Sequence, residues 1–458
     1  MSCLKPSHII EFDIRLMKKK LYGVFYTDIK LSLAILKFLN LPKQASILDP
    51  CCGRGSFIKS AILCGFNKVY GVDIDKAAVD FCNDNYLQSI VIRADTLSNS
   101  GTTILNQLGV SQKMDCIIGN PPYGKWNNTN LADKNFRLQV KRNGNDMFIA
   151  ALLRAFEMIK NNGKIAYILP KNLLHVAKYK VFRKYLLANF SIKAIIDIGI
   201  YFKEVRGEQI ILILQKTPPL GNFISLETLE GDEFQHNISI PQNFYEDKII
   251  LFKNQLDKDI YQALNKQAKL GTLIKNIHRG KYTSEDAIKG KNIQKFRIKN
   301  MQPQLFGNQI FIQNIYSVES GIIGSYAGNL KASQTVTVLT DGDKFTCHYI
   351  LFLLHSKIAN FYLFKYCYNS SHLTVHADSS YIKDIPLPTF NSAKKLRILK
   401  ICSDLEKKIY MSNEWLQSLY DLNELAMSMY NLDIRMKNYI NETMNCIMSD
   451  KWSIEHDC

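Results

Sequence analysis

Short apolar runs alternate with longer amphipathic stretches through the first half of the chain. The apolar runs predict strands over residues 46–48, 68–73, 89–93, 114–119 and 164–169. Between them, helical spacing of apolar residues predicts helices over 56–64, 76–86 and 146–160. Two further runs, at 192–197 and 209–214, favour a hairpin at one edge of the sheet because the segment between them is too short for a crossover. This alternation predicts a doubly wound α/β domain, which we place at residues 1–225.

The second half of the chain is less informative. Beyond about residue 392 its apolar residues fall at helical spacing, and we interpret that end as packing helices with no chemistry of their own. At 458 residues the chain exceeds one ordinary domain, so more than one is expected.

Composition indicates a folded intracellular protein. Hydrophobic residues make up 47% of the chain and charged residues 22%, as in folded rather than disordered proteins. No apolar run approaches the ~20 residues of a membrane span, and the N-terminus lacks the apolar core of a signal peptide. The 11 cysteines are scattered, and neither the adjacent Cys51 and Cys52 nor a histidine cluster has zinc-site spacing. We therefore expect reduced thiols, no structural metal and a location in the bacterial cytoplasm.

The net charge of +17 favours a polyanionic partner. Cationic residues are dense between 275 and 299, where they are interleaved with Tyr282 and Phe296. Such a stretch is typical of a surface that contacts nucleic-acid phosphates. The candidate DNA-binding residues are Arg279, Lys281, Lys289, Lys291 and Lys295. Two simpler interpretations stay open, namely a generally basic proteome and a solvated charged face.

Four polar residues lie at the ends of four predicted strands: Asp49, Asp73, Asp95 and Asn120. In doubly wound sheets the ligand binds at the carboxyl ends of the strands, near the point where the strand order reverses. These four side chains are therefore expected to share one site.

A glycine turn, Gly53-Arg54-Gly55, follows the first of these strands and by itself is a weak indication of a nucleotide site. The chain has no GxxxxGK[ST] motif, and Ile58 interrupts the GxGxxG pattern. A carboxylate at Asp73 suits two ribose hydroxyls, and Asp95 or a neighbouring backbone group suits an adenine amino group. Because the turn offers no basic residue except Arg54, the best-fitting ligand is an adenosine that carries an amino acid instead of phosphates, S-adenosyl-L-methionine.

The stretch Asn120-Pro121-Pro122-Tyr123 closes the strand over 114–119. Two successive prolines stop a strand and rigidify the backbone. The Asn120 carboxamide oxygen and the Pro121 carbonyl are two acceptors on one rigid corner, and an amino group held there can donate a hydrogen to each. The alternative is a proline-rich turn with a packing tyrosine.

In these motifs the chain resembles the N6-adenine DNA methyltransferases of the γ arrangement, similar to the TaqI type and to the methyltransferase parts of type IIG restriction-modification enzymes. The matching segments are 22–27, 49–55, 71–75, 94–95 and 120–123, and residues 277–281, 330–334 and 381–388 resemble target-recognition domains. Asp28 departs from the family's N-terminal cofactor motif, which commonly has proline at this position. The resemblance implies a Rossmann-like S-adenosylmethionine-dependent domain, an α+β target-recognition domain over 240–395 and a helical end over 396–458.

The resemblance also implies roles for single residues. Cofactor-binding residues are expected at Phe25, Thr27, Asp49, Cys51, Gly53, Asp73, Asp95 and Asn120. Catalytic residues are expected at Asn120, Pro121, Pro122, Tyr123 and Phe202. Phe202 falls where the family places an aromatic ring that stacks on the flipped adenine, and Tyr201 is its rival.

The expected function is site-specific methylation of adenine N6 in double-stranded DNA, on a base flipped out of the duplex. The enzyme would act beside a cognate restriction endonuclease or as an orphan. Protein glutamine methyltransferases and guanine-N2 RNA methyltransferases share the tetrapeptide, and a non-catalytic DNA-binding specificity protein is a further alternative. Cytosine N4 is chemically close to adenine N6. The basic stretch 125–145 is interpreted either as a loop that closes over DNA or as a disordered surface loop.

Overall fold

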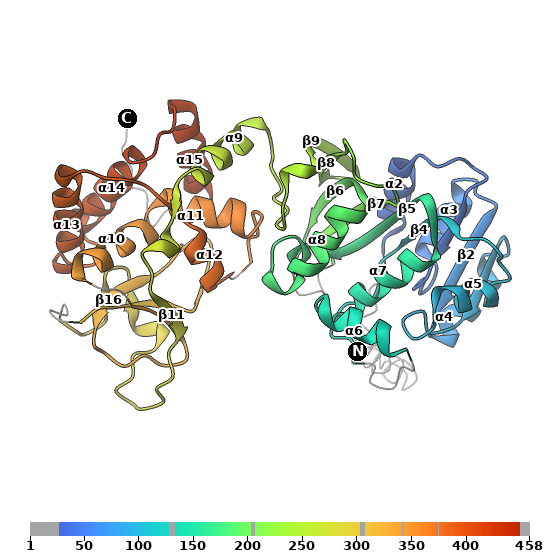
Figure 1. The fold of residues 1–458 in the computed structure, drawn as a ribbon, viewed down its shortest axis with the longest axis horizontal. Coiled ribbons are helices and arrows are strands. Elements are labelled where there is room, and N and C mark those ends of the chain that lie inside the picture. The colour runs from blue at the N-terminus through green and yellow to red at the C-terminus, as the bar shows by residue number, and fades with distance from the viewer. Residues whose placement is uncertain are drawn as a thin grey trace, which may run out of the picture. The chain divides into compact units, whose positions relative to one another are not determined.

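The computed structural model describes residues 27–127, 133–202, 207–302, 307–340, 343–373 and 375–448. Phe25, an expected cofactor contact, lies outside these residues. The chain forms two compact units that are divided between Lys253 and Asn254 (Figure 1). None of the described helices combines the length and the apolar character that a membrane crossing requires.

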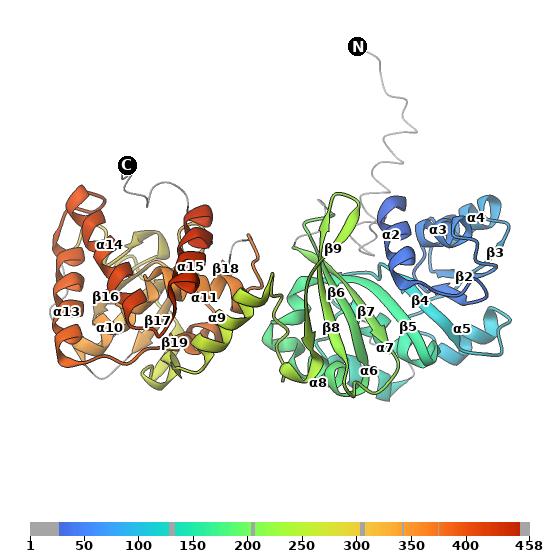
Figure 2. The ribbon, with the colours of Figure 1, turned by 90° about the horizontal axis from the view of Figure 1, so that it is seen from above.

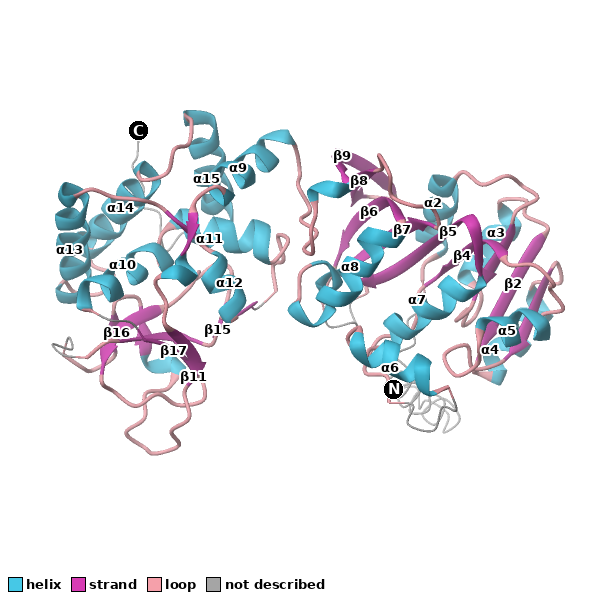
Figure 3. Cartoon of the chain, in the orientation of Figure 1, coloured by secondary structure: helices cyan, strands magenta, loops and turns pink. Residues whose placement is uncertain are grey.

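The first unit is built on one nine-stranded sheet (Figure 3) with the order β3-β2-β1-β4-β5-β7-β6-β8-β9. Its strands are β1 (Ser46–Asp49), β2 (Lys68–Asp73), β3 (Ser89–Arg93), β4 (Met114–Gly119), β5 (Ile159–Pro170), β6 (Ser191–Gly199), β7 (Gln209–Gln215), β8 (Phe223–Glu230) and β9 (Glu233–Pro241). Strands β1 to β5 pair in parallel, and β7 runs antiparallel between β5 and β6. The predicted doubly wound α/β fold is confirmed.

Helices cover both faces of this sheet. They are α2 (Ile29–Leu39), α3 (Ser56–Leu63), α4 (Lys76–Asn85), α5 (Gly101–Gln107), α6 (Lys134–Arg142), α7 (Met147–Met158) and α8 (Lys180–Asn189). Figure 2 shows α2, α3 and α4 on one face and α5, α7 and α8 on the other. The starts of α2, α4 and α5 are capped by Asp28, Asp75 and Ser100, whose side chains accept backbone N–H bonds.

A hydrophobic core fixes the strands whose ends carry the predicted site. Ile35 and Phe57 from the helices pack with Ile47, Ile118 and Ile168 from the sheet, and each of these side chains is at most 3% exposed. Burial of each such side chain contributes about 1.5–3 kcal/mol. The carboxyl ends of β1 and β4 are therefore held rigidly beside each other.

The structure differs from the sequence-based expectation at the far side of the sheet. The hairpin of β6 and β7 forms as predicted, but it is not at the edge, because β8 pairs in parallel with β6 and β9 closes the sheet. The first unit consequently extends to Lys253 rather than to residue 225. Strand β5 also begins earlier, at Ile159, and accommodates Asn162 in the left-handed region with φ of 64°.

The second unit combines small sheets with helices. Its four-stranded sheet has the order β11-β17-β14-β16, made of β11 (Asn276–Arg279), β14 (Gln309–Gln313), β16 (Gly324–Gly328) and β17 (Val336–Thr340). Short strand pairs are β10 (Ala268–Lys269) with β19 (Pro386–Leu387), β12 (Ile293–Gln294) with β13 (Arg297–Ile298), and β15 (Ile315–Tyr316) with β18 (Val375–His376). The helices are α9 (Gln255–Asn265), α10 (Lys344–Leu354), α11 (Lys357–Tyr362), α12 (Ser379–Asp384), α13 (Ser392–Lys407), α14 (Asn413–Ser428) and α15 (Ile434–Ile447). The predicted helical end is confirmed.

Two of the three segments that resemble target-recognition domains lie side by side in this unit. The Gly280 N–H donates to the Val336 carbonyl at 2.8 Å, and the Tyr282 N–H donates to the Ala332 carbonyl at 3.0 Å. Residues 277–282 and 332–336 therefore form one main-chain framework. The third segment lies elsewhere, because Pro386–Leu387 pairs with Ala268–Lys269.

Replacing Gly280 by alanine is expected to destabilise the protein by about 1–3 kcal/mol. A Cβ there would lie 2.3 Å from the Ser333 carbonyl oxygen and 2.6 Å from that of Ala332, and neither backbone atom can move without breaking the framework. Calorimetry of the full chain should show a lower unfolding temperature. The control is Gly109→Asn, because Gly109 has φ of 70° and open space around its Cβ position. Equal unfolding temperatures for wild type and G280A would contradict the close packing at this position.

Candidate active site

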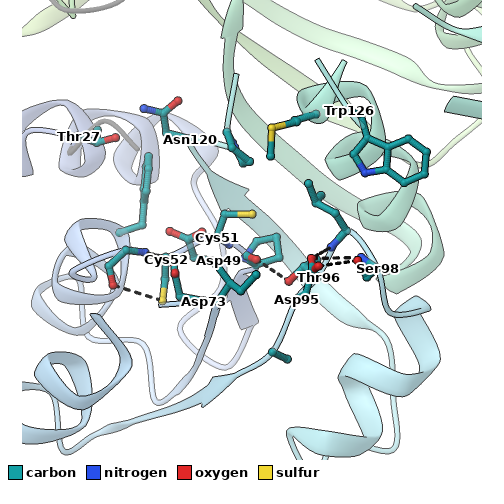
Figure 4. Close-up of a pocket in the computed structure, with 18 of the residues that line it drawn as sticks. Thr27, Asp49, Cys51, Cys52, Asp73, Asp95, Thr96, Ser98, Asn120 and Trp126 are labelled. Carbon is teal, nitrogen blue, oxygen red and sulfur yellow. Dashed lines mark hydrogen bonds between the residues drawn. The ribbon is translucent and has the colours of Figure 1, made fainter. Parts of the chain in front are cut away.

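A cavity of about 240 Å³ opens at the carboxyl ends of β1, β2 and β4, on the side where the strand order reverses. Asp49, Asp73, Asp95 and Asn120 all line it (Figure 4). The structure thus brings together the four polar residues that the sequence predicted to share one site. Thr27, Cys51 and Gly53 line the same cavity.

The glycine turn between β1 and α3 brings the main chain close to Asp73. Gly53 and Gly55 have φ of 51° and 77°, a region that other residues rarely adopt. The Gly53 N–H donates to Asp73 Oδ2 at 2.7 Å. A Cβ on Gly55 would lie 2.7 Å from the ring of Tyr86, so the turn has no room for a side chain there.

Asp49 is the most deeply buried carboxyl of the cavity, at 3% exposed. Burial raises its pKa to about 8, and the nearby Asp73 adds to the rise, although a hydrogen bond from the Cys51 N–H at 3.1 Å opposes it. A Cβ on Gly119 would lie 2.7 Å from Asp49 Oδ1, so the carboxyl packs against the main chain directly before Asn120. A cationic ligand beside Asp49 would offset the burial penalty of its charged form.

Asp73 and Asp95 organise the backbone around the cavity. Burial raises the pKa of Asp73, and N–H bonds from Asp75 and Gly53 partly offset the rise. Asp95 Oδ1 accepts the N–H groups of Leu97 and Ser98 at 3.0 and 3.2 Å, and its Oδ2 accepts the Ser98 hydroxyl. The Asp95 carboxylate therefore stabilises the turn after β3, which we call the 95–98 turn.

The corner after β4 presents Asn120 and Pro122 to the cavity, while Pro121 between them is buried. The half-buried Tyr123 extends toward β5, where its hydroxyl donates to the Ile168 carbonyl at 3.2 Å. Burial raises the pKa of this hydroxyl. Tyr123 is not among the described residues that line the cavity.

The segment after β6 carries Phe202 and its rival Tyr201. Gln209, a fully buried residue, accepts the N–H groups of Tyr201 and Phe202 at 3.0 and 3.3 Å and donates to the Gly207 carbonyl at 2.6 Å. Phe202 is 5% exposed in the hydrophobic core, whereas Tyr201 is half-buried. Tyr201 is therefore the more accessible of the two rings in this structure.

Several further lining residues were not identified as site residues from the sequence, among them Ile74, Lys125, Trp126 and Met147. Lys125 and Trp126 come shortly after the corner at 120–123, and this nearness in the sequence was the one available signal. The stretch 125–145 was interpreted as a loop, but the structure forms α6 in it and brings its first residues to the cavity. Phe148, at the start of α7, is not among the described residues that line the cavity. It is buried and packs against Tyr179, with ring centroids 5.5 Å apart.

The candidate DNA-binding residues do not all lie on the surface. Arg279, Lys281, Lys289 and Lys291 are exposed. Lys295 is 1% exposed, so its selection as a phosphate contact is corrected: the turn between β12 and β13 places it in the interior. Burial lowers the pKa of Lys295 to about 7.

Comparison with known proteins adds the family. Residues 9–275, more than half of the chain, match the N-6 DNA Methylase family. The chain belongs to the N-6 DNA methylase family. Its first unit is therefore the Rossmann-like methyltransferase domain that the sequence motifs implied.

Two curated relatives illustrate the match. The chain is 30% identical over 220 residues to the type II methyltransferase M.VspI of Vibrio sp. (strain 343). The aligned region covers 46% of this chain and 52% of the relative. It is 25% identical over 185 residues to the type II methyltransferase M.HincII of Haemophilus influenzae, covering 39% of this chain and 34% of the relative. The chain spans about half or less of the length of these relatives.

Two solved structures share the fold of this N-6 DNA methylase. The type IIL restriction-modification enzyme MmeI in complex with DNA aligns over 97% of this chain and 77% of its own, with a TM-score of 0.54 and 13% identity. A nuclease-deletion mutant of the type ISP enzyme LlaGI aligns over 86% of this chain and 56% of its own, with a TM-score of 0.53 and 12% identity. At such identities the likeness shows the fold alone.

N-6 DNA methylases use S-adenosyl-L-methionine, and the described lining residues fit it. The cofactor carries a sulfonium, an ammonium and a carboxylate, so its net charge is positive. The cavity offers the buried carboxyl of Asp49 and the half-buried carboxyl of Asp73, and Lys125 is the one basic residue among the described lining residues. Asp73 suits the ribose hydroxyls, and the 95–98 turn suits the polar edge of adenine.

Proposed function

We propose that this chain transfers a methyl group from S-adenosyl-L-methionine to the N6 amino group of adenine within a specific sequence of duplex DNA. The observation that carries the proposal is the position of Asn120 and Pro122 on the wall of the cavity that also contains Asp49, Asp73 and Asp95. A corner built to accept an amino group thus borders the site that suits the methyl donor.

The corner acts by positioning the target nitrogen. The Asn120 side-chain oxygen and the Pro121 carbonyl accept the two hydrogens of the amino group, which directs the nitrogen lone pair toward the cavity. The bound cofactor supplies a methyl group on a positively charged sulfur. As the nitrogen is methylated it loses a proton, and the two acceptors stabilise the positive charge that develops before the proton leaves. Orientation of this kind needs no strong general base.

The target adenine must leave the duplex to reach this corner. We propose that its ring stacks between Tyr123 and Phe202, which offsets part of the unstacking cost. Two sets of hydrogen bonds support the proposal, because they hold both segments in place: Tyr123 donates to the Ile168 carbonyl, and the N–H groups of Tyr201 and Phe202 donate to Gln209. Tyr201 is the alternative partner, since it is the more exposed ring.

We propose that the second unit recognises the DNA sequence. Its exposed cations Arg279, Lys281, Lys289 and Lys291 suit phosphate contacts, which position a protein on the duplex. Tyr282 lies among them, with the ammonium groups of Lys281 and Lys331 at 5.9 and 6.0 Å from its ring centroid. The framework of residues 277–282 and 332–336 supports the role, because it holds Arg279, Lys281 and Tyr282 on a main chain that is paired with another.

We further propose that the methylation belongs to a restriction-modification system, in which it protects DNA from a cognate endonuclease. The support is that relatives over the first unit are named type II methyltransferases. DNA modified by this chain should then resist cleavage by an endonuclease that cuts the same sequence.

The decisive experiment expresses the full chain in a host free of DNA methylation. Single-molecule sequencing of the host DNA should find N6-methyladenine at one sequence motif, and an Asn120→Ala variant should leave that motif unmodified. Mass spectrometry of hydrolysed nucleosides separates N6-methyladenine from N4-methylcytosine. Unmodified DNA together with methylated RNA or protein would reject the proposal.

A further inference from the structure

We propose that the indole of Trp126 closes the adenine end of the cavity and packs against the purine ring of the bound cofactor. The inference rests on the proposed function in one respect, the identity of the cofactor. It concerns a residue outside every segment that carried the family resemblance. Trp126 would be a cofactor-binding residue contributed by the stretch that follows the catalytic corner.

The position of Trp126 is the first observation. The residue is 6% exposed, and it lines the cavity together with Leu97 and Ser98 of the 95–98 turn. In the view of Figure 4 it lies on the same side of the cavity as Thr96 and Ser98. The polar edge of a purine can therefore meet this turn while one of its faces meets the indole.

The main chain on both sides of Trp126 is firmly held. Its N–H donates to the Asn145 carbonyl at 3.1 Å, and the Met147 N–H donates to the Gly124 carbonyl at 2.9 Å. Between these two bonds, Lys125 Nζ lies 3.3 Å from Asp146 Oδ1. Asp146 is 5% exposed and also accepts bonds from Lys178 and Tyr179, both at 2.7 Å. These contacts hold the residues that follow the corner against the start of α7.

The ring of Trp126 is supported from α6 and α7. Its centroid lies 5.8 Å from that of Phe136, with the ring planes at 84°. The Arg154 guanidinium lies 3.4 Å from the Phe136 centroid and pairs with Glu157 at 2.8 Å. Glu157 Oε2 in turn accepts the N–H of Gly101, the first residue of the helix that follows the 95–98 turn. One network of contacts therefore supports both Trp126 and the turn that shares the cavity wall with it.

The remaining wall is suited to a flat apolar face. Ile74 lines the cavity and is 45% exposed, although it is a large aliphatic side chain, and Leu97 and Met147 line it as well. A purine in contact with Ile74 and Trp126 would remove apolar surface of both from water. Stacking of a base on an aromatic side chain typically strengthens binding by about one to two orders of magnitude.

Tryptophan fluorescence tests the inference directly. The chain has 3 tryptophans: Trp126, Trp452, and Trp415, which is fully buried in the second unit and donates its indole N–H to the Leu405 carbonyl. In a Trp452→Phe background, S-adenosyl-L-homocysteine should therefore change the emission of Trp126 while Trp415 stays constant. Adding Trp126→Phe should remove this change, although calorimetry still detects binding. Methylthioadenosine, which lacks the amino acid, should also change the emission, and methionine should not.

Affinity supplies the second readout. Calorimetric titration should show that Trp126→Ala weakens the binding of S-adenosyl-L-homocysteine by about 10- to 100-fold. Trp126→Phe should weaken this binding by about a few fold. Circular dichroism checks that both variants are folded; if W126A is not, the fluorescence titration of W452F decides. The inference is overturned if the W452F protein binds the ligand without a change in emission, an outcome that leaves the proposed function standing. Absence of binding to wild-type protein would instead overturn the cofactor assignment itself.

Discussion

Replacing Asn120 by alanine is expected to reduce kcat for methyl transfer by about a hundred- to a thousandfold. The side chain lines the cavity directly after β4, and in the proposed mechanism its oxygen and the Pro121 carbonyl accept the two hydrogens of the target amino group. Removing it leaves the nitrogen lone pair undirected, while the cavity walls formed by Asp49 and Asp73 are unchanged. Steady-state transfer of radiolabelled methyl groups to duplex DNA, at saturating concentrations of DNA and methyl donor, measures the effect.

The matched control is Asn106→Ala, because Asn106 is an exposed asparagine on α5 and does not line the cavity. This variant should methylate DNA at the wild-type rate. The affinity of N120A for S-adenosyl-L-homocysteine should stay within a few fold of wild type, which separates a loss of positioning from a loss of cofactor. A kcat for N120A within about tenfold of wild type would contradict the role of the corner.

Replacing Asp49 by asparagine is expected to stabilise the unliganded protein at pH 8 and to impair cofactor binding. The Asp49 carboxyl is fully buried, and burial raises its pKa from 3.8 to about 8. The folded state therefore binds a proton more tightly than the unfolded state does, so Asp49 lowers the free energy of unfolding as the pH rises from about 4 to about 8. Asparagine keeps an oxygen for the Cys51 N–H and has no charge to desolvate.

Urea unfolding of wild type and D49N at pH 5 and pH 8 measures this effect. The variant should be the more stable protein at pH 8, by on the order of a few kcal/mol, and the difference should shrink at pH 5. Calorimetry should show that wild type binds S-adenosyl-L-homocysteine more tightly as the pH rises from 6 to 8, because the ammonium group favours the ionised Asp49. D49N should bind weakly at every pH. A stability difference that does not depend on pH would contradict the raised pKa of Asp49.

Local pattern predicted most of the first unit and the location of its site. Apolar runs identified the strands that end at Asp49, Asp73 and Asn120, because each run is long enough to be buried on both faces. The glycine turn was predictable for a similar reason, since only glycine adopts the φ values of Gly53 and Gly55 without strain. The polar residues then converged because the carboxyl ends of parallel strands lie at one edge of the sheet.

Contacts between distant segments were not predictable in this way. The β8–β9 hairpin joins the sheet because β8 pairs with β6. The residues of β6 alone do not show that a further strand will pair with it. Lys295 belongs by sequence to a dense cationic stretch, yet the turn between β12 and β13 turns it inward. Phe202 has the spacing of a base-stacking ring, and its place beside the hydrophobic core could not be read from that spacing.

The sequence by itself determined the strands β1 to β7 in chain order, the four polar strand ends and the proline corner at Asn120, because these depend on the nearest few residues. The tertiary structure decided which side chains face the cavity. Trp126 reaches the same cavity as Asp73 because its N–H bonds to the Asn145 carbonyl and its ring packs on Phe136, which hold the stretch after the corner in place. Such contacts join residues that are far apart in the chain, and their free energy exists only once the sheet has formed.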